Sequence, residues 1–431
     1  MKALFVYPRF QRHAEANPEL RALVPMNEYL GSPSLGIAAL AAVTPPGWEV
    51  EFRDDRLAPA DAPTDADVVA FSFFTPAATR AFELARSFRA QGKKVVAGGI
   101  FPTLMPEETA PHFDAVVIGE GEQSWPRLLA DVAQGRLQPR YQNDAEVDCA
   151  ALPLPRVSLY LQQERGAFHP DDYPVQLSRG CPLGCQACAL PISMTRKLRD
   201  LPLDHVLGQL EALGRAGKLA CLTEDTSWLP GHPQRQLGAL FDAMAARPEV
   251  ARISYIGISM PMVLQASAAL LARARAAGVT MFYLVGGFDP ITLKAFTGKD
   301  PKALQRAYAA IAKCQAAGIE PYTSFLLGND DDDLGTVDRM LEFAARARLR
   351  KAEFAIFTPY PGTPAWHRLL AEGRILHRDW SKYNDANVVF RPKQMTPAEL
   401  RAGYLRLWGD FYRGRLPELS ALSQAERTIQ F

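Results

Sequence analysis

The stretch SRGCPLGCQAC, residues 178–188, places three cysteines, Cys181, Cys185 and Cys188, within eight positions of the chain. It follows a short run at 173–177 that is expected to be a strand, so the cysteines lie in the loop after that strand. Thiolates this close in sequence can converge on one soft metal centre. Structural zinc usually takes four protein ligands, and no fourth Cys or His lies nearby. The pattern therefore favours a [4Fe–4S] cluster with one open iron. The alternatives are a zinc site that uses a distant fourth ligand and three unrelated cysteines of the core.

The composition is that of an ordinary globular protein. The 431 residues are 48% hydrophobic and 22% charged, with Lys+Arg 48 against Asp+Glu 47. This length predicts two or three domains, and the balanced charge gives no support for nucleic-acid binding. No apolar run reaches the roughly 18 residues that a membrane span needs, and residues 1–8 resemble a strand rather than a signal peptide. Six cysteines, three of them scattered, do not form a secreted disulfide framework, so a reducing, cytoplasmic compartment is expected.

Residues 1–140 alternate short apolar strands with helical segments. The expected strands are 2–7, 48–53, 67–74, 94–97 and 115–118, and the expected helices are 36–43 and 79–91. Strands separated by helices indicate βαβ units and hence a doubly wound, Rossmann-like parallel sheet. Ligands of such sheets bind beyond the carboxyl ends of the strands, which here carry the segments 72–76, 98–103 and 119–122.

Residues 141–172 are polar and dotted with proline, which predicts a linker. The region 173–375 then repeats a strand–helix unit, with strands expected at 173–177, 219–222, 253–259, 279–285, 319–327 and 352–357. Helices are expected at 204–215, 234–246, 263–277 and 301–317. Six units predict a partial (β/α)6 TIM barrel, whose site gathers at the strand C-termini. Residues 376–431 are expected to form a C-terminal helical extension. The predicted fold class is therefore α/β, and the C-terminal extension is predicted to contain only helices.

A Cys-x3-Cys-x2-Cys loop after a strand, inside a β/α repeat, resembles the radical S-adenosylmethionine (SAM) superfamily. The resemblance implies that Cys181, Cys185 and Cys188 hold a [4Fe–4S] cluster whose open iron is chelated by SAM. One electron from the cluster would then cleave SAM to a 5′-deoxyadenosyl radical. It also implies an external electron donor, such as flavodoxin or ferredoxin.

The resemblance also implies SAM contacts at the ends of the later strands. Acidic residues follow the second strand, where a carboxylate suits the methionine ammonium, although a helix-capping pair is the alternative there. The turn after the fourth strand carries an aspartate where related enzymes usually have Gly-x-Glu-Ser. The residues assigned to SAM are Glu224, Asp225, Ser259, Gly286, Gly287 and Asp289.

The N-terminal region is similar to the cobalamin-binding domain that precedes the catalytic domain in one large radical SAM subgroup. The Gly-Gly turn at 98–103 and the Gly-Glu-Gly-Glu segment at 119–122 stand at that domain's loop positions. None of the seven histidines lies in the Asp-x-His-x-x-Gly pattern that ligates cobalt from below, and Phe101 stands where relatives often have His. A vestigial domain that binds nothing is the alternative. The residues assigned to cobalamin are Ser72, Thr75, Gly98, Gly99, Phe101, Thr103, Gly119, Glu120 and Gly121.

Three further segments bear on the site. Four aspartates at 330–333 follow the fifth strand and predict the acidic first turn of a helix rather than a metal site. The proline-rich turn at 358–364 resembles cobalamin-dependent radical SAM enzymes. The segment 379–392 resembles the subgroup of hopanoid methylases and of the methylases and anaerobic cyclase of bacteriochlorophyll synthesis. The aromatic residues of this C-terminal region either line a substrate cavity or pack a helical cap.

The resemblance covers essentially the whole chain and implies a cobalamin-dependent methyltransferase. Methylcobalamin would deliver methyl to an unactivated carbon after hydrogen abstraction by the 5′-deoxyadenosyl radical. The substrate would be a small molecule, namely a lipid, a tetrapyrrole or a secondary metabolite. One alternative is a non-methylating radical reaction, such as cyclisation or rearrangement, with or without cobalamin. A non-catalytic iron–sulfur electron carrier or corrinoid-binding module is another, against which the six-unit barrel and the glycine turn at 286–287 count.

Overall fold

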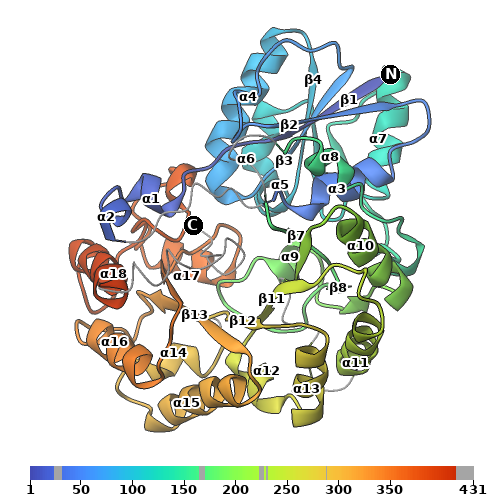
Figure 1. The fold of residues 1–431 in the computed structure, drawn as a ribbon. Coiled ribbons are helices and arrows are strands. Elements are labelled where there is room, and N and C mark those ends of the chain that lie inside the picture. The colour runs from blue at the N-terminus through green and yellow to red at the C-terminus, as the bar shows by residue number, and fades with distance from the viewer. Residues whose placement is uncertain (24–31, 165–169, 223–227, 230–231, 288, 414–431) are drawn as a thin grey trace.

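Two six-stranded parallel β-sheets organise the chain (Figure 1). The computed structural model describes residues 1–23, 32–164, 170–222, 228–229, 232–287 and 289–413. The N-terminal sheet lies at the top of Figure 1 and the second sheet, coloured green to orange, lies below it. Helices surround both sheets, which confirms the predicted α/β fold class.

The N-terminal sheet is doubly wound. Its strand order is β2 (Glu49–Asp54), β1 (Lys2–Tyr7), β3 (Val68–Ser72), β4 (Lys94–Gly98), β5 (Ala115–Ile118) and β6 (Arg140–Gln142), and every pairing is parallel. After β1 the chain forms β2 on one side of it, and the later strands β3 to β6 then follow on its other side. The point at which the strand order reverses, the switch point, therefore lies between β1 and β3. Ligand-binding crevices in such sheets open at this point.

Helices cover both faces of the N-terminal sheet, so its central strands are buried along most of their length. On one face Trp125 of α7 (Ser124–Ala133) packs against Phe5, with ring centres 5.0 Å apart. On the other face Phe88 of α4 (Ala78–Ala90) packs against Phe71 at 6.1 Å. The other helices around this sheet are α3 (Leu35–Ala42), α5 (Ile100–Leu104) and α6 (Pro106–Thr109), whereas α1 (His13–Ala16) and α2 (Leu20–Leu23) lie beside α18 (Pro397–Tyr412) (Figure 1).

The second sheet is a curled half barrel. Its strands follow one another in chain order, as β7 (Asp172–Pro174), β10 (Leu219–Leu222), β11 (Ile253–Ile258), β12 (Met281–Leu284), β13 (Glu320–Leu327) and β14 (Ala352–Ile356). Helices lie outside it (Figure 1), namely α10 (Leu203–Arg215), α11 (His232–Ala245), α12 (Met260–Gln265), α13 (Ala268–Ala276), α14 (Thr292–Ala295), α15 (Pro301–Ala316) and α16 (Thr336–Arg346). The short helix α9 (Leu190–Ser193) packs against α5 of the N-terminal region instead, and α17 (Pro364–Ala371) follows β14. The six strand–helix units predicted from the sequence are confirmed.

Alternation of side chains along the strands gives the half barrel two different faces. Phe325 and Phe354 point outward, where their rings lie 5.3 Å from Phe296 and 5.2 Å from Trp408 respectively. The inward face carries a separate cluster formed by Cys221, Tyr255, Met281, Tyr283 and Tyr322. The concave side is therefore unusually rich in polar atoms, whereas TIM-barrel interiors are dominated by branched apolar side chains.

Some expected elements differ in the structure. The single helix expected at 263–277 is two helices, because Ser267 accepts a hydrogen bond from Leu270 N (3.1 Å) and starts α13. The expected linker contains α8 (Ser158–Leu161), which is anchored by Tyr160. The Tyr160 hydroxyl donates to Ser34 O (2.6 Å) and accepts from Ala38 N (3.0 Å), so this segment packs on the N-terminal sheet's helices.

The C-terminal region is less helical than expected. Within its described part, the α-helix is α18 (Pro397–Tyr412), and the stretch before it is irregular apart from a short turn at Trp380–Lys382. Its aromatic side chains Trp380, Tyr383, Trp408, Phe411 and Tyr412 are buried in packing contacts, and none of them lines the cavity described below. The packing interpretation of these residues is therefore the correct one. No helix that the structure describes has the length and apolar character needed to span a membrane.

Candidate functional site

A cavity of about 1540 Å³ lies between the two sheets. The strand ends Tyr7 and Ser72 line it from the switch point of the N-terminal sheet, and Cys221 and Tyr255 line it from the half barrel. Pockets for drug-sized ligands hold roughly 300–1,000 Å³, so this volume suits a larger ligand or several ligands together.

Two glycine loops form the N-terminal wall of the cavity, and one threonine joins them. The Thr103 hydroxyl donates to Gly99 O (2.8 Å) and accepts from Gly119 N (2.9 Å). Gly99 has a φ of 102°, and a Cβ there would lie 2.7 Å from Phe73 O, so only glycine fits. The loops therefore present backbone rather than side chains to the cavity.

Replacing Gly99 with Ala is expected to lower corrinoid retention at least about tenfold, because strain of about 1–3 kcal/mol would displace this loop. Gly135→Ala is the matched control, since Gly135 has a φ of 68° but open space around it. The measurement is corrinoid content after desalting. Equal retention by the two variants would show that the Gly99 loop does not hold the corrinoid.

Seven of the nine residues assigned to cobalamin line the cavity, and two lie elsewhere. The seven are Ser72, Gly98, Gly99, Thr103, Gly119, Glu120 and Gly121. Thr75 is buried, and Phe101 is fully buried with its ring 5.5 Å from that of Trp380. Phe101 thus joins the N-terminal domain to the C-terminal region, and its side chain does not reach the cavity.

A buried ionic clamp joins the 119–122 loop to the cysteine loop. Arg179 binds Glu120 (3.0 Å) and Glu122 (2.6 Å), and Arg199 binds the other oxygen of Glu120 (2.8 Å). All four side chains are at most 9% exposed. Burial alone would lower the pKa of the Arg179 guanidinium, but the two carboxylates raise it above its ordinary value. Both carboxylate oxygens of Glu120 are thus bound by arginines. A contact between Glu120 and cobalamin stays a prediction, and we expect the backbone of Glu120 to make it.

The cysteine loop begins directly after Arg179. A short antiparallel ladder, β8 (Ser178–Arg179) with β9 (Arg199–Asp200), closes the loop, and Cys181 N donates to Thr195 O (3.0 Å). Gly180 has a φ of 83°, and a Cβ there would collide with Lys197 O. Glycine at this position therefore lets the two arms of the loop approach each other.

The three cysteines of this loop differ in exposure, and the donor set fits an iron–sulfur cluster. Cys181 is buried, and Cys185 and Cys188 are half-buried. Within the described ranges, no group of three or more His, Cys, Asp or Glu side chains is arranged to hold one metal ion. A [4Fe–4S] cluster does not need such an arrangement, because each cysteine binds a different iron atom.

The residues assigned to SAM lie at the carboxyl ends of the half-barrel strands, apart from Glu224 and Asp225, which fall outside the described residues. Ser259 follows β11, and the glycine pair 286–287 follows β12. The carboxylate of Asp289 accepts hydrogen bonds from Ile291 N (2.8 Å) and the Thr292 hydroxyl (2.7 Å). Burial raises the pKa of Asp289. In this structure the Asp289 side chain closes its own loop, and its contact with SAM stays a prediction.

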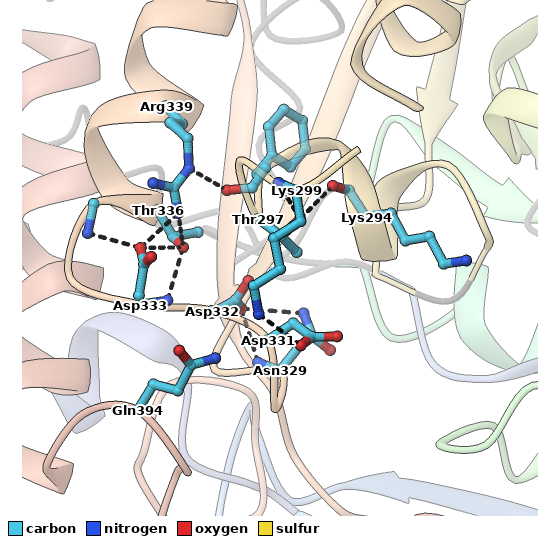
Figure 2. Close-up of polar contacts among 12 residues, drawn as sticks. Lys294, Thr297, Lys299, Asn329, Asp331, Asp332, Asp333, Thr336, Arg339 and Gln394 are labelled. Carbon is cyan, nitrogen blue, oxygen red and sulfur yellow. Dashed lines mark hydrogen bonds and ion pairs between the residues drawn. The ribbon is translucent and has the colours of Figure 1, made fainter. Parts of the chain in front are cut away.

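The four aspartates at 330–333 each have their own partners, and Figure 2 shows those of Asp331, Asp332 and Asp333. Asp330 binds Arg374 (2.7 Å). Asp331 binds Lys299 (3.0 Å), and Asp333 binds Arg339 (2.5 Å). Asp332 is buried and accepts from Gly328 N and Asn329 N, and its burial raises its pKa to about 6. The carboxylates stabilise the turn that precedes α16, which begins at Thr336, so the prediction that they form the first turn of the helix is wrong. Asp332 is also buried rather than solvated.

Sequence reasoning missed a polar set on the barrel side of the cavity. The Tyr283 hydroxyl donates to Glu353 (2.6 Å), and the Tyr360 hydroxyl donates to Asp385 (2.9 Å). Burial raises the pKa of Glu353 to about 7 and that of Asp385 to about 6. Alternation of tyrosine and acidic residues with apolar ones inside the expected strands could have indicated this inward polar face.

Residues 29–129 match the family model for the B12 binding domain. Bacteriochlorophyllide d C-12(1)-methyltransferase from Chlorobaculum tepidum is 26% identical over 388 residues, which are 88% of this chain and 82% of that protein. Over most of its length the chain is thus similar to methyltransferases, and residues 29–129 match the B12 binding domain. Hopanoid C-2 methylase from Rhodopseudomonas palustris is 24% identical to the chain over 359 residues, covering 80% of the chain and 60% of the methylase.

Two solved structures share the fold of this chain. The radical SAM methyltransferase TsrM from Kitasatospora setae, solved with tryptophan and a SAM analogue, has a TM-score of 0.64 and 17% identity. That match covers 86% of this chain and 76% of TsrM. OxsB, a cobalamin-dependent SAM radical enzyme, has a TM-score of 0.70 and 15% identity, covering 98% of this chain and 69% of OxsB.

Proposed function

We propose that this protein is a radical SAM C-methyltransferase that transfers methyl from cobalamin to an unactivated carbon. The observation that carries the proposal is one cavity lined both by the glycine loops of the B12-binding domain and by Arg179 and Gly180, the residues that lead into the cysteine loop. Methyl transfer of this kind requires the substrate carbon to lie between two cofactors, and a shared cavity provides that arrangement.

The residues present fit both cofactors. Cys181, Cys185 and Cys188 would hold the [4Fe–4S] cluster, which when bound supplies the electron that cleaves SAM. The backbone of the 98–103 and 119–121 loops would hold the corrinoid, without a cobalt ligand from position 101. The packed walls of the cavity would exclude water from a reactive radical.

The first test is corrinoid content after anoxic reconstitution with cobalamin. We expect one corrinoid per chain together with an intact cluster, and transfer of label from methyl-labelled SAM into a product. A cluster-loaded protein that forms 5′-deoxyadenosine but retains no corrinoid would contradict methyl transfer. It would favour the second candidate, a cyclisation or rearrangement, which the relation to the anaerobic magnesium-protoporphyrin IX monomethyl ester cyclase of Cereibacter sphaeroides supports (24% identical over 373 residues).

A further inference from the structure

Three carboxyl groups face the cavity from the barrel side, and their recorded partners are all neutral. Asp172 accepts from the Ser254 hydroxyl (2.6 Å), while Glu353 and Asp385 accept from tyrosine hydroxyls. Among the residues that the structure describes, the other groups recorded against these carboxyls are the Cys221 thiol, the Thr358 hydroxyl and neighbouring acids. Buried charge without a counter-ion is costly, so this face of the cavity is matched to a positively charged ligand.

The cations on the opposite wall are already neutralised by local carboxylates. Arg56 binds Asp54 (2.6 Å), and Arg80 binds Asp55 (2.8 Å). Two more arginines line this wall: Arg9 shares Asp55 with Arg80 (4.0 Å), and Arg12 interacts with Glu15. Arg179 is held in the clamp with Glu120 and Glu122. The cavity therefore has a charge-balanced wall on the N-terminal side and an acidic wall on the barrel side.

Two further basic residues lie near the acidic wall. His13 lines the cavity, but burial lowers its pKa to about 4, so it is neutral at pH 7. The ammonium of Lys351 lies at the start of β14, 4.0 Å from the sulfur of Met281. Within the part of the chain that the structure describes, no cation is among the groups that shift the pKa of Glu353 or Asp385.

An unsatisfied hydroxyl lies behind this acidic wall, next to the cavity but not on its surface. Tyr322 is 3% exposed and belongs to the inward cluster, with its ring centre 5.2 Å from that of Tyr283. Its hydroxyl has no hydrogen-bond partner among the described residues. Buried hydroxyls normally have one, and the tyrosine rings around it offer π-faces to a cation.

We infer that the substrate carries a positively charged nitrogen, which binds in the barrel lumen with Glu353 and Asp385 as its counter-charges. Tyr283 and Tyr360 orient these carboxylates, and the rings of Tyr255 and Tyr360, which line the cavity, flank the ammonium. The inference rests on the proposed function, since it identifies the substrate class of the same cavity. It disfavours substrates whose buried part is a carboxylate or a phosphate.

The test uses calorimetry on cluster- and cobalamin-loaded protein with SAM present and no reductant, so that the SAM site is filled and no turnover occurs. The probes are 2-phenylethylammonium and its neutral counterpart of similar shape, 3-phenylpropan-1-ol, at pH 8. We expect the ammonium to bind at least about tenfold more tightly than the alcohol. Glu353→Gln and Asp385→Asn should each reduce this preference, whereas Glu342→Gln, on the exposed face of α16, should retain it.

Equal binding of the two probes, tighter binding of the alcohol, or binding of neither would overturn the inference. The comparison of probes on the unsubstituted protein decides the question even if a variant fails to fold. Because the assay contains no methyl-transfer step, its failure is distinct from failure of the proposed function, which the corrinoid and labelled-SAM measurements test.

Discussion

Replacing Cys185 with Ala is expected to abolish cluster assembly and to reduce 5′-deoxyadenosine formation by more than about 100-fold. Removing a residue that only hydrogen-bonds to a metal ligand typically lowers metal affinity or activity by about 10–100-fold. Removal of Cys185 takes away a ligand itself, so the loss should be larger. The measurements are iron and sulfide content after anoxic reconstitution, and 5′-deoxyadenosine formed with dithionite. The same result is expected for Cys181 and Cys188.

Cys314→Ala is the control for this prediction. Cys314 is fully buried in α15, and its burial raises the pKa of its thiol to about 12, as befits a packing residue. We expect this variant to keep its iron content, with at most a modest loss of thermal stability. If the Cys185 variant instead retained full iron and sulfide, the cluster would have to be held elsewhere.

Much of the fold could be predicted because its strands are local, apolar signals. The strands expected at 115–118 and 219–222 have the same bounds as β5 and β10, since strands buried on both faces appear as short continuous apolar runs. The helix at Pro301–Ala316 was likewise delimited by a proline at its start and a glycine after its end. The parallel order of both sheets then follows from the βαβ alternation.

The clamp and the position of Asp385 in the acidic wall could not be predicted, because both depend on contacts between distant residues, whereas Glu353 lies in an expected strand. Arg179 and Glu120 are 59 positions apart, and each resembles an ordinary surface charge in the sequence. Asp385 lies in an irregular segment of the C-terminal region, so no periodicity places it against Tyr360. The sequence motif identified the cysteine loop and the glycine loops, but not the ion pairs between them.

The clamp leads to the second large prediction, for Arg179→Met. This change leaves Glu120 and Glu122 buried without their shared guanidinium, and breaking a buried ion pair in this way costs about 3–5 kcal/mol. We expect the midpoint of urea unfolding to fall accordingly. The clamp joins the 119–122 loop to the cysteine loop, so its loss should let the positions of the two cofactors vary relative to each other. We therefore also expect more 5′-deoxyadenosine to be formed for each methyl group transferred.

Two further variants separate the clamp from general damage to this region. Arg196→Met removes an exposed guanidinium that binds only Pro182 O (3.2 Å) among the contacts recorded for it, and it should leave both readouts unchanged. Adding Glu122→Gln to Arg179→Met should recover part of the lost stability, since Arg179 is the recorded ion-pair partner of Glu122.

A normal ratio of 5′-deoxyadenosine to methylated product in Arg179→Met would show that the clamp stabilises the fold without positioning the cofactors. Unchanged stability would show that water or other groups compensate the buried carboxylates.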